Sequence, residues 1–126
     1  MKKVISTPNA PAAIGPYSQA IETEELVFIS GQVPIIPATG KLIEGGIREQ
    51  SKQVMKNIGA ILEAAGLNYQ NVVKCTCLLA DMADFKDMNE VYGSYFTAEP
   101  PARAAFQVCK LPLGALVEIE AIATKK

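Results

Sequence analysis

The stretch that decides the fold is PARAAFQVCKLPLGALVEIEAIA, residues 101–123. Both of its ends carry the period-2 pattern of half-buried strands, and the KLPLGA between them is rich in turn-forming residues. The pattern predicts strands over about 103–109 and 116–123. Joined as a hairpin, they would place residue 107 near residue 118.

Polar residues gather on these two strands. Because strand side chains alternate, Arg103 and Gln107 share one face, and Glu118 and Glu120 share a face of the next strand. The hairpin predicts that all four converge on the sheet face without helices. Two interpretations stay open: a solvated face or structural ion pair, or an arginine that grips a small carboxylate while a glutamate activates water.

The rest of the chain supplies helices and further strands. Apolar residues at threes and fours predict amphipathic helices over 47–65 and about 84–97. Runs of apolar and β-branched residues predict strands over 26–31 and 71–80. The order predicts one α+β domain over residues 1–126, with both helices on one face of a single mixed sheet.

The composition limits the kinds of partner that we expect for this chain. The chain is 49% hydrophobic and only 20% charged, which is apolar for so small a domain and favours a homo-oligomer. A net charge of −1 and the lack of any long basic run argue against nucleic-acid binding. No apolar stretch approaches a membrane span, and the N-terminus does not read as a signal peptide, so we expect a cytoplasmic protein without membrane partners.

The chain has no histidine, which excludes a Ser-His-Asp triad, a Cys-His pair and an imidazole metal site within it. Acid–base chemistry must then fall to carboxylates, Tyr, Lys, Cys, backbone groups or water. Cys75, Cys77 and Cys109 are interpreted as packing residues. A zinc site needs four ligands at other spacings, so we expect no metal site.

Several motifs together resemble one known family. Residues 101–123 are similar to the C-terminal signature of the Rid family (RidA/YjgF type) of reactive-intermediate imine/enamine deaminases. APAAIGPYSQA (10–20) and SGQVP (30–34) resemble two further family motifs, in the expected order. ADMADFKDMNEVYGSYF (80–96) resembles the family's second helix. The resemblance covers essentially the whole chain.

The resemblance implies a chorismate-mutase-like fold, built as a homotrimer with clefts between adjacent subunits. It implies an enzyme that hydrolyses short 2-imino acids, such as 2-iminobutanoate and 2-iminopropanoate, to 2-oxo acids and ammonia. Such imines arise when pyridoxal-phosphate enzymes act on serine and threonine. The reaction needs no cofactor or metal.

Position by position, Arg103 matches the family's carboxylate-binding arginine and Glu118 the glutamate that orients or activates water. Residues that line the family's cleft fall on Tyr17, Ser30, Gly31 and Asn89. Without the resemblance, Tyr17 would be interpreted as a packed loop aromatic and Asn89 as a helix-surface amide. Ser30 and Gly31 would be interpreted as a strand terminus. Many bacterial relatives carry a cysteine at the position of Ala105, and other deaminating relatives also read ARAA. The alanine is therefore not interpreted as a loss of activity, but it argues against any required thiol mechanism.

Two alternatives come from other functional classes. One is a non-enzymatic regulatory or ligand-binding trimer, since relatives have been described as regulators, chaperone-like proteins or RNA-degrading translation inhibitors. The other is a sensor that binds stable 2-oxo acids in the same cleft. The retained pair Arg103 and Glu118 speaks against a purely scaffolding role, and the net charge against strong RNA binding.

Overall fold

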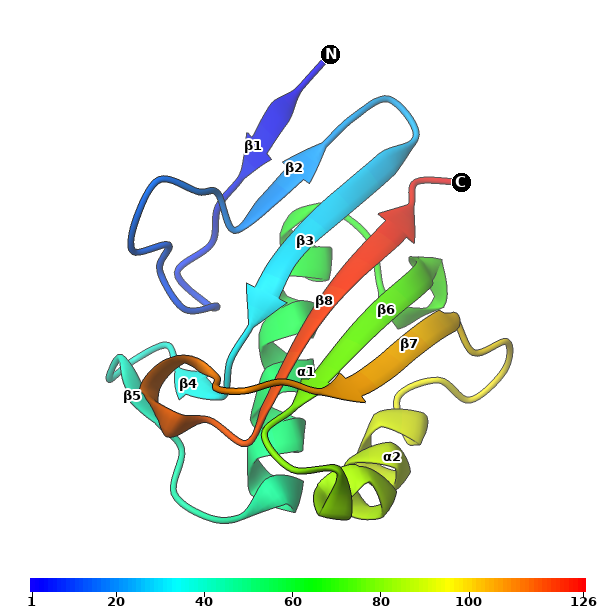
Figure 1. Cartoon of the computed structure of the whole chain (residues 1–126). Coiled ribbons are helices and arrows are strands. Elements are labelled where there is room, and N and C mark those ends of the chain that lie inside the picture. Colours follow the sequence, from blue (N-terminus) through cyan, green and yellow to red (C-terminus); the bar gives the residue numbers. More distant parts are fainter.

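A six-stranded sheet runs through the computed structural model, which describes residues 1–126, and both helices cover one face of that sheet (Figure 1). The sheet strands are β1 Lys3–Ile5, β2 Ala20–Glu22, β3 Leu26–Gln32, β6 Val72–Leu79, β7 Ala102–Gln107 and β8 Val117–Thr124. A separate small ribbon pairs β4 Ile35–Ile36 with β5 Lys41–Leu42. The helices are α1 Ile47–Ala64 and α2 Phe85–Gly93, and short 3-10 turns occupy Tyr69–Asn71, Met82–Asp84 and Pro112–Gly114.

The strand order is β1-β2-β3-β8-β6-β7, and every neighbouring pair is antiparallel except β6 and β7. The sheet is therefore mixed. The α+β prediction, with one mixed sheet and two helices on one face, is confirmed.

The core lies between α1 and the sheet. The buried apolar side chains of α1 are Ile47, Val54, Met55, Ile58, Ile61 and Leu62. Cys75 and Cys77, on β6, are buried in the same core, so their prediction as packing residues is confirmed. Cys109 is exposed, and the packing prediction for it is wrong. It lies after the end of the edge strand β7, whose residues are themselves mostly exposed.

The second helix is shorter than predicted. It ends at Gly93 instead of near residue 97, and residues 82–84 before it form a 3-10 turn. The Ser94 hydroxyl donates to the carbonyl of Val91 at 2.6 Å, and the amides of Tyr95 and Phe96 bond three residues back. These bonds tighten the chain beyond a glycine, which is a weak helix former.

The predicted hairpin between the last two strands is wrong. β7 pairs with β6 in parallel, and β8 pairs with the opposite side of β6. Because α2 carries the chain back to the beginning of β6, the next strand runs parallel to β6 at the sheet edge, as in a βαβ crossover. The connection to β8 then passes the end of β6, where Val108 donates to Leu79 and Ala80 donates to Leu116.

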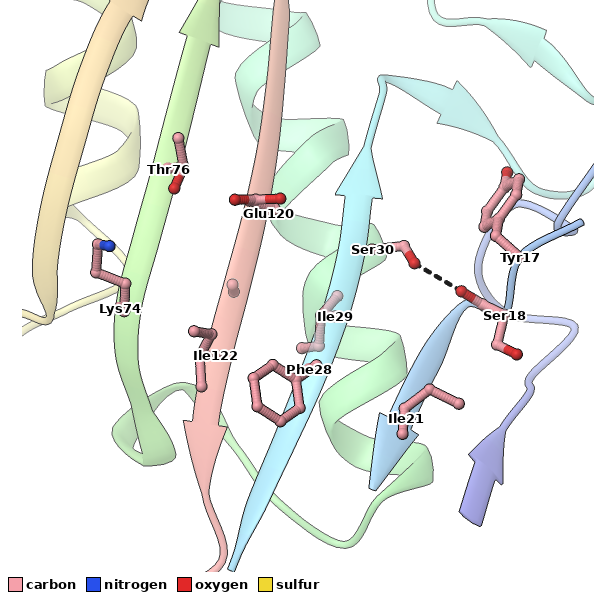
Figure 2. A pocket seen from close by; sticks show the side chains of 11 residues that line it. Tyr17, Ser18, Ile21, Phe28, Ile29, Ser30, Lys74, Thr76, Glu120 and Ile122 are labelled. Carbon is pink, nitrogen blue, oxygen red and sulfur yellow. Dashed lines mark hydrogen bonds between the residues drawn. The ribbon is translucent and has the colours of Figure 1, made fainter. Parts of the chain in front are cut away.

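This strand order separates the polar residues that the hairpin would have gathered. Arg103 lies beside the buried Cys75 and therefore faces the helices. The amide oxygen of Gln107 accepts from the Met82 backbone at 2.9 Å. Only Glu118 and Glu120 lie on the helix-free face, where Figure 2 shows Glu120. Their predicted convergence with Arg103 and Gln107 on that face is therefore wrong.

Neither helix is both long enough and apolar enough to cross a membrane.

Candidate functional site

The carboxylate of Glu118 lies directly against the backbone of Gly31. A methyl group added to Gly31 would overlap the Glu118 carboxylate oxygen and lie 3.0 Å from the carboxylate carbon. The close approach falls where the pairing of β3 with β8 shifts register, between Ile29 and Gln32. Glycine is therefore required here for space, so that Glu118 can lie across β3.

A cavity of about 660 Å³ opens beside this contact, and we call it the Glu118 cavity. Four of the six site residues predicted from the sequence line it: Tyr17, Ser30, Gly31 and Glu118. Glu120 lines it as well, although the sequence left the role of Glu120 open. The structure thus brings these four predicted residues together around one carboxylate.

A buried glutamine holds the loop that walls this cavity. The Gln19 side chain is 4% exposed. Its oxygen accepts from the Thr7 amide at 2.7 Å, and its nitrogen lies 2.8 Å from the Pro11 carbonyl and 3.0 Å from that of Thr7. The Ser30 hydroxyl donates to the Ser18 carbonyl at 2.6 Å, which ties β3 to the same loop (Figure 2). Sequence reasoning missed Gln19, because a glutamine in an irregular segment carries no local signal.

Glu118 is electrostatically unusual. Burial raises the pKa of its half-buried carboxyl group above the ordinary value, and the neighbouring charge of Glu120 raises it further. Neither glutamate takes part in any of the four ion pairs of the chain. A carboxylate whose pKa lies closer to neutrality is a better proton acceptor from water than an ordinary glutamate.

Arg103 lies on the helix side of the edge strand β7 and is held there by α2. Its guanidinium donates to the Asn89 side-chain oxygen at 2.6 Å. The guanidinium carbon lies 5.4 Å from the ring centroid of Phe85 and 5.0 Å from that of Tyr92. These three helix residues, spaced by four and three, share one face of α2. Amide and aromatic contacts of this kind orient a guanidinium without neutralising its charge.

No carboxylate of the chain pairs with Arg103. The only other arginine, Arg48, pairs with both Asp87 and Glu90. The interpretation that Arg103 forms a structural ion pair with a glutamate is therefore wrong. Its exposed, oriented and unpaired positive charge suits an anionic ligand that presents two oxygens in one plane.

The site residues form two groups on one chain. Tyr17, Ser30, Gly31 and Glu118 line the cavity, whereas Arg103 and Asn89 lie across the sheet on the other face. Sequence reasoning also missed Phe85 and Tyr92 as partners of Arg103. Their helical spacing from Asn89 is visible in the sequence, but it was interpreted only as a buried stripe.

The chain is thus a small α+β domain whose candidate site residues fall into these two groups. Over residues 7–125 the chain matches the endoribonuclease L-PSP family, and it belongs to that family.

Individual relatives and solved structures show which members of the family the chain is similar to. It is 57% identical over 125 residues to the mouse 2-iminobutanoate/2-iminopropanoate deaminase, covering 99% of this chain and 93% of that protein. The solved structure of YyfA from Yersinia pestis, of the conserved Rid protein family, has a TM-score of 0.96 at 47% identity, covering 98% of this chain and 99% of YyfA. Escherichia coli TdcF, solved with bound serine, has a TM-score of 0.94 at 40% identity, with the same coverage. The predicted Rid resemblance is confirmed.

Proposed function

We propose that this chain hydrolyses short 2-imino acids, including 2-iminobutanoate and 2-iminopropanoate, to 2-oxo acids and ammonia. The observation that carries the proposal is the unpaired Arg103 guanidinium, oriented by Asn89 and two aromatic rings. The mouse relative, at 57% identity, bears the name of this activity and supports it. The serine named with TdcF is an α-amino acid, whose carboxylate is the group a 2-imino acid presents.

Arg103 binds the substrate carboxylate. A guanidinium has five N–H donors, and the Asn89 contact occupies one side of it. Two parallel N–H groups are left for the two carboxylate oxygens. Each charge-assisted hydrogen bond contributes about 1.5–3 kcal/mol. Asn89 acts in this scheme through Arg103, by fixing the plane of the guanidinium.

Glu118 activates water for attack on the carbon–nitrogen double bond. Its carboxylate takes a proton as the water oxygen bonds to the imine carbon, and the electron pair of the C=N bond moves to nitrogen, which is protonated. The resulting tetrahedral carbinolamine then collapses: Glu118 passes the hydroxyl proton to the amine nitrogen, the C–N bond breaks, ammonia leaves with the bonding electron pair, and the C=O bond of the 2-oxo acid forms. In total one water is consumed and one ammonia released. The raised pKa of Glu118 suits both directions of proton transfer.

Tyr17, Ser30 and Gly31 complete the lining around the substrate. Tyr17 is half exposed at the cavity, and its hydroxyl accepts from the Ile14 amide at 3.4 Å. The Ser30 hydroxyl donates to the Ser18 carbonyl and keeps its own lone pairs for a ligand donor such as the imine N–H. Gly31 leaves the space that Glu118 occupies.

A complete site requires a second copy of the chain, because Arg103 and Glu118 lie on opposite faces of one sheet. We assign the site to a contact in which the β7 edge of one copy meets the Glu118 cavity of the next. A head-to-tail contact generates a ring when its rotation closes, and the trimer implied by the family is a closed ring of this kind. Phe28 and Phe106, both nearly half exposed on the helix-free face, supply apolar area for it.

The test couples this protein to a threonine dehydratase and measures how fast 2-oxobutanoate forms from the released imine. Arg103→Ala is expected to abolish the acceleration, and Arg103→Lys to be nearly as poor, because a lysine ammonium cannot make the two-point contact. Arg48→Ala serves as the matched control, since it removes the other arginine from an exposed site on α1. Unchanged acceleration in both Arg103 variants would contradict the proposal.

The same arginine favours one second candidate, a sensor of stable 2-oxo acids, because substrate and product share the carboxylate. Calorimetry with 2-oxobutanoate, run beside the turnover assay, separates the two: a sensor binds the product tightly and shows no turnover. Nucleic acid is not expected as a partner at a net charge of −1. Retention of RNA on a filter at low salt, lost at high salt, would contradict that expectation.

A further inference from the structure

Leu113 has a backbone conformation that a leucine rarely adopts. Its φ is 59° and its ψ 18°, and it is the only residue other than glycine with a positive φ. The β-carbon makes this left-handed region unfavourable for a bulky side chain, and such outliers gather where a protein needs a side chain in one particular place. The leucine side chain gains no burial in return, because it is 67% exposed.

Leu113 lines the Glu118 cavity together with a second exposed aliphatic residue. Ile14, on the loop held by Gln19, lines the same cavity and is 87% exposed. The polar lining residues come mainly from β3 and β8, whereas the loops and β4 contribute the apolar ones: Pro11, Ala12, Ile14, Val33, Ile35, Pro112 and Leu113. The cavity therefore has a polar floor and apolar walls, which is the division typical of sites that fix a ligand by polar groups and select its size by apolar ones.

We propose that Leu113, together with Ile14, forms the subsite for the substrate's side chain and gives the enzyme a preference for aliphatic chains longer than methyl. This inference rests on the proposed deaminase function. With the carboxylate on Arg103 and the reacting carbon beside Glu118, the side chain is the part of a 2-imino acid left to meet the apolar walls. The left-handed conformation at residue 113 holds the leucine side chain over the cavity.

The size of the effect follows from the burial of methylene groups. Each methylene transferred from water to an apolar wall changes binding by about fourfold. From the methyl to the propyl side chain, two methylenes are added, so kcat/KM is expected to rise by about 15-fold. The preference belongs to binding and is expected mainly in KM, with kcat nearly constant along the series.

The experiment generates three imines with an L-amino-acid oxidase, dioxygen and catalase from alanine, 2-aminobutanoate and norvaline. Semicarbazide traps whatever imine the protein has not hydrolysed, so the fall in semicarbazone gives kcat/KM for each chain length. Leu113→Asn is the informative variant, because asparagine has a similar size, tolerates a positive φ and is polar. Leu113→Gly removes the side chain and accepts the same backbone. Val73→Thr, an exposed residue on β6 outside the cavity, is the control.

In both Leu113 variants the roughly 15-fold preference for the propyl side chain is expected to fall to about twofold or less. Hydrolysis of the methyl imine is expected to stay within about twofold of the wild type, and Val73→Thr to keep the whole series unchanged. An equal loss on all three imines, a change in oligomeric state of the Leu113 variants, or a flat series in the wild type would overturn the subsite. Turnover of no imine at all by the wild type would instead overturn the proposed function, and the subsite with it.

Discussion

Replacing Gly31 by alanine separates the activity of this protein from its stability. The added methyl group would overlap the Glu118 carboxylate oxygen and lie 3.0 Å and 3.3 Å from the carboxylate carbon and Cγ. These atoms are the flexible end of a side chain, so the carboxylate moves away and the backbone stays. Gly31 does not have a positive φ, and alanine therefore fits the backbone.

The expected magnitudes differ for the two properties. A displacement of about 1 Å in a group that positions water costs about 100-fold in rate, or about 2.7 kcal/mol of transition-state stabilisation. Stability is expected to stay level or to rise by about 0.4–1 kcal/mol, because alanine restricts the unfolded chain more than glycine does. Turnover of 2-iminobutanoate and denaturant unfolding, measured on the same preparations, test both expectations.

Gly93→Ala is the matched control. Apart from its chain neighbours and the nearby backbone of its own helix, no atom lies within 4 Å of the position its β-carbon would take, so the substitution changes composition in the same way without touching the site. It is expected to keep full activity and to add up to about 1 kcal/mol of stability, as alanine does in helices. If Gly31→Ala keeps the wild-type kcat/KM, the assigned position of Glu118 is refuted. If the variant loses activity only because it unfolds, the catalytic use of Glu118 is refuted.

Three further predictions concern charge and the cavity wall. Burial chiefly raises the pKa of Glu118, and the charge of Glu120 raises it further. Glu120→Gln is therefore expected to move the acid limb of the kcat/KM–pH profile to lower pH. An acid limb that stays in place or moves to higher pH would contradict this. A carboxyl group whose pKa is raised on folding destabilises the folded state once the pH rises through the pKa of the unfolded chain. Glu118→Gln is therefore expected to raise Tm at pH 7 and to lose that advantage below about pH 4. An equal change in Tm at both pH values would count against this. Gln19→Ala leaves buried backbone groups of the loop unpaired and is expected to cost about 2–4 kcal/mol in chemical unfolding, with Gln70→Ala, on the exposed turn before β6, near zero.

The sequence allowed the local elements to be predicted but not their neighbours. The spacing of apolar residues predicted α1 to within one residue at its end and β3 and β6 to within one residue at either end. Strand order depends instead on where α2 returns the chain, a long-range fact that no window of sequence contains. For that reason the hairpin failed, although the alternation of side chains along β7 and β8 was right. The short β4 and β5 were missed, since two residues carry no periodicity.

For the candidate site, too, the residues could be predicted from the sequence but their arrangement in space could not. Residue types and family motifs were enough to select Arg103 and Glu118, and the structure places the first beside Asn89 and the second across Gly31. The hypothesis that Arg103 and Glu118 meet on one face depended on a hairpin between β7 and β8. The parallel pairing of β7 with β6 contradicts it. The roles of the six site residues remain predictions, which the variants above test.

The central claim is that one working site combines Arg103 of one copy with Glu118 of the next. Arg103→Ala and Glu118→Gln are each expected to be inactive, and each remains a folded partner for the other. Mixed at equal amounts and allowed to exchange subunits, they form an intact site wherever a copy with Arg103 adjoins a copy with Glu118. In random head-to-tail rings this occurs at about one quarter of the contacts. Recovery of about a quarter of the wild-type activity is therefore the predicted result, and no recovery after proven subunit exchange would contradict the shared site.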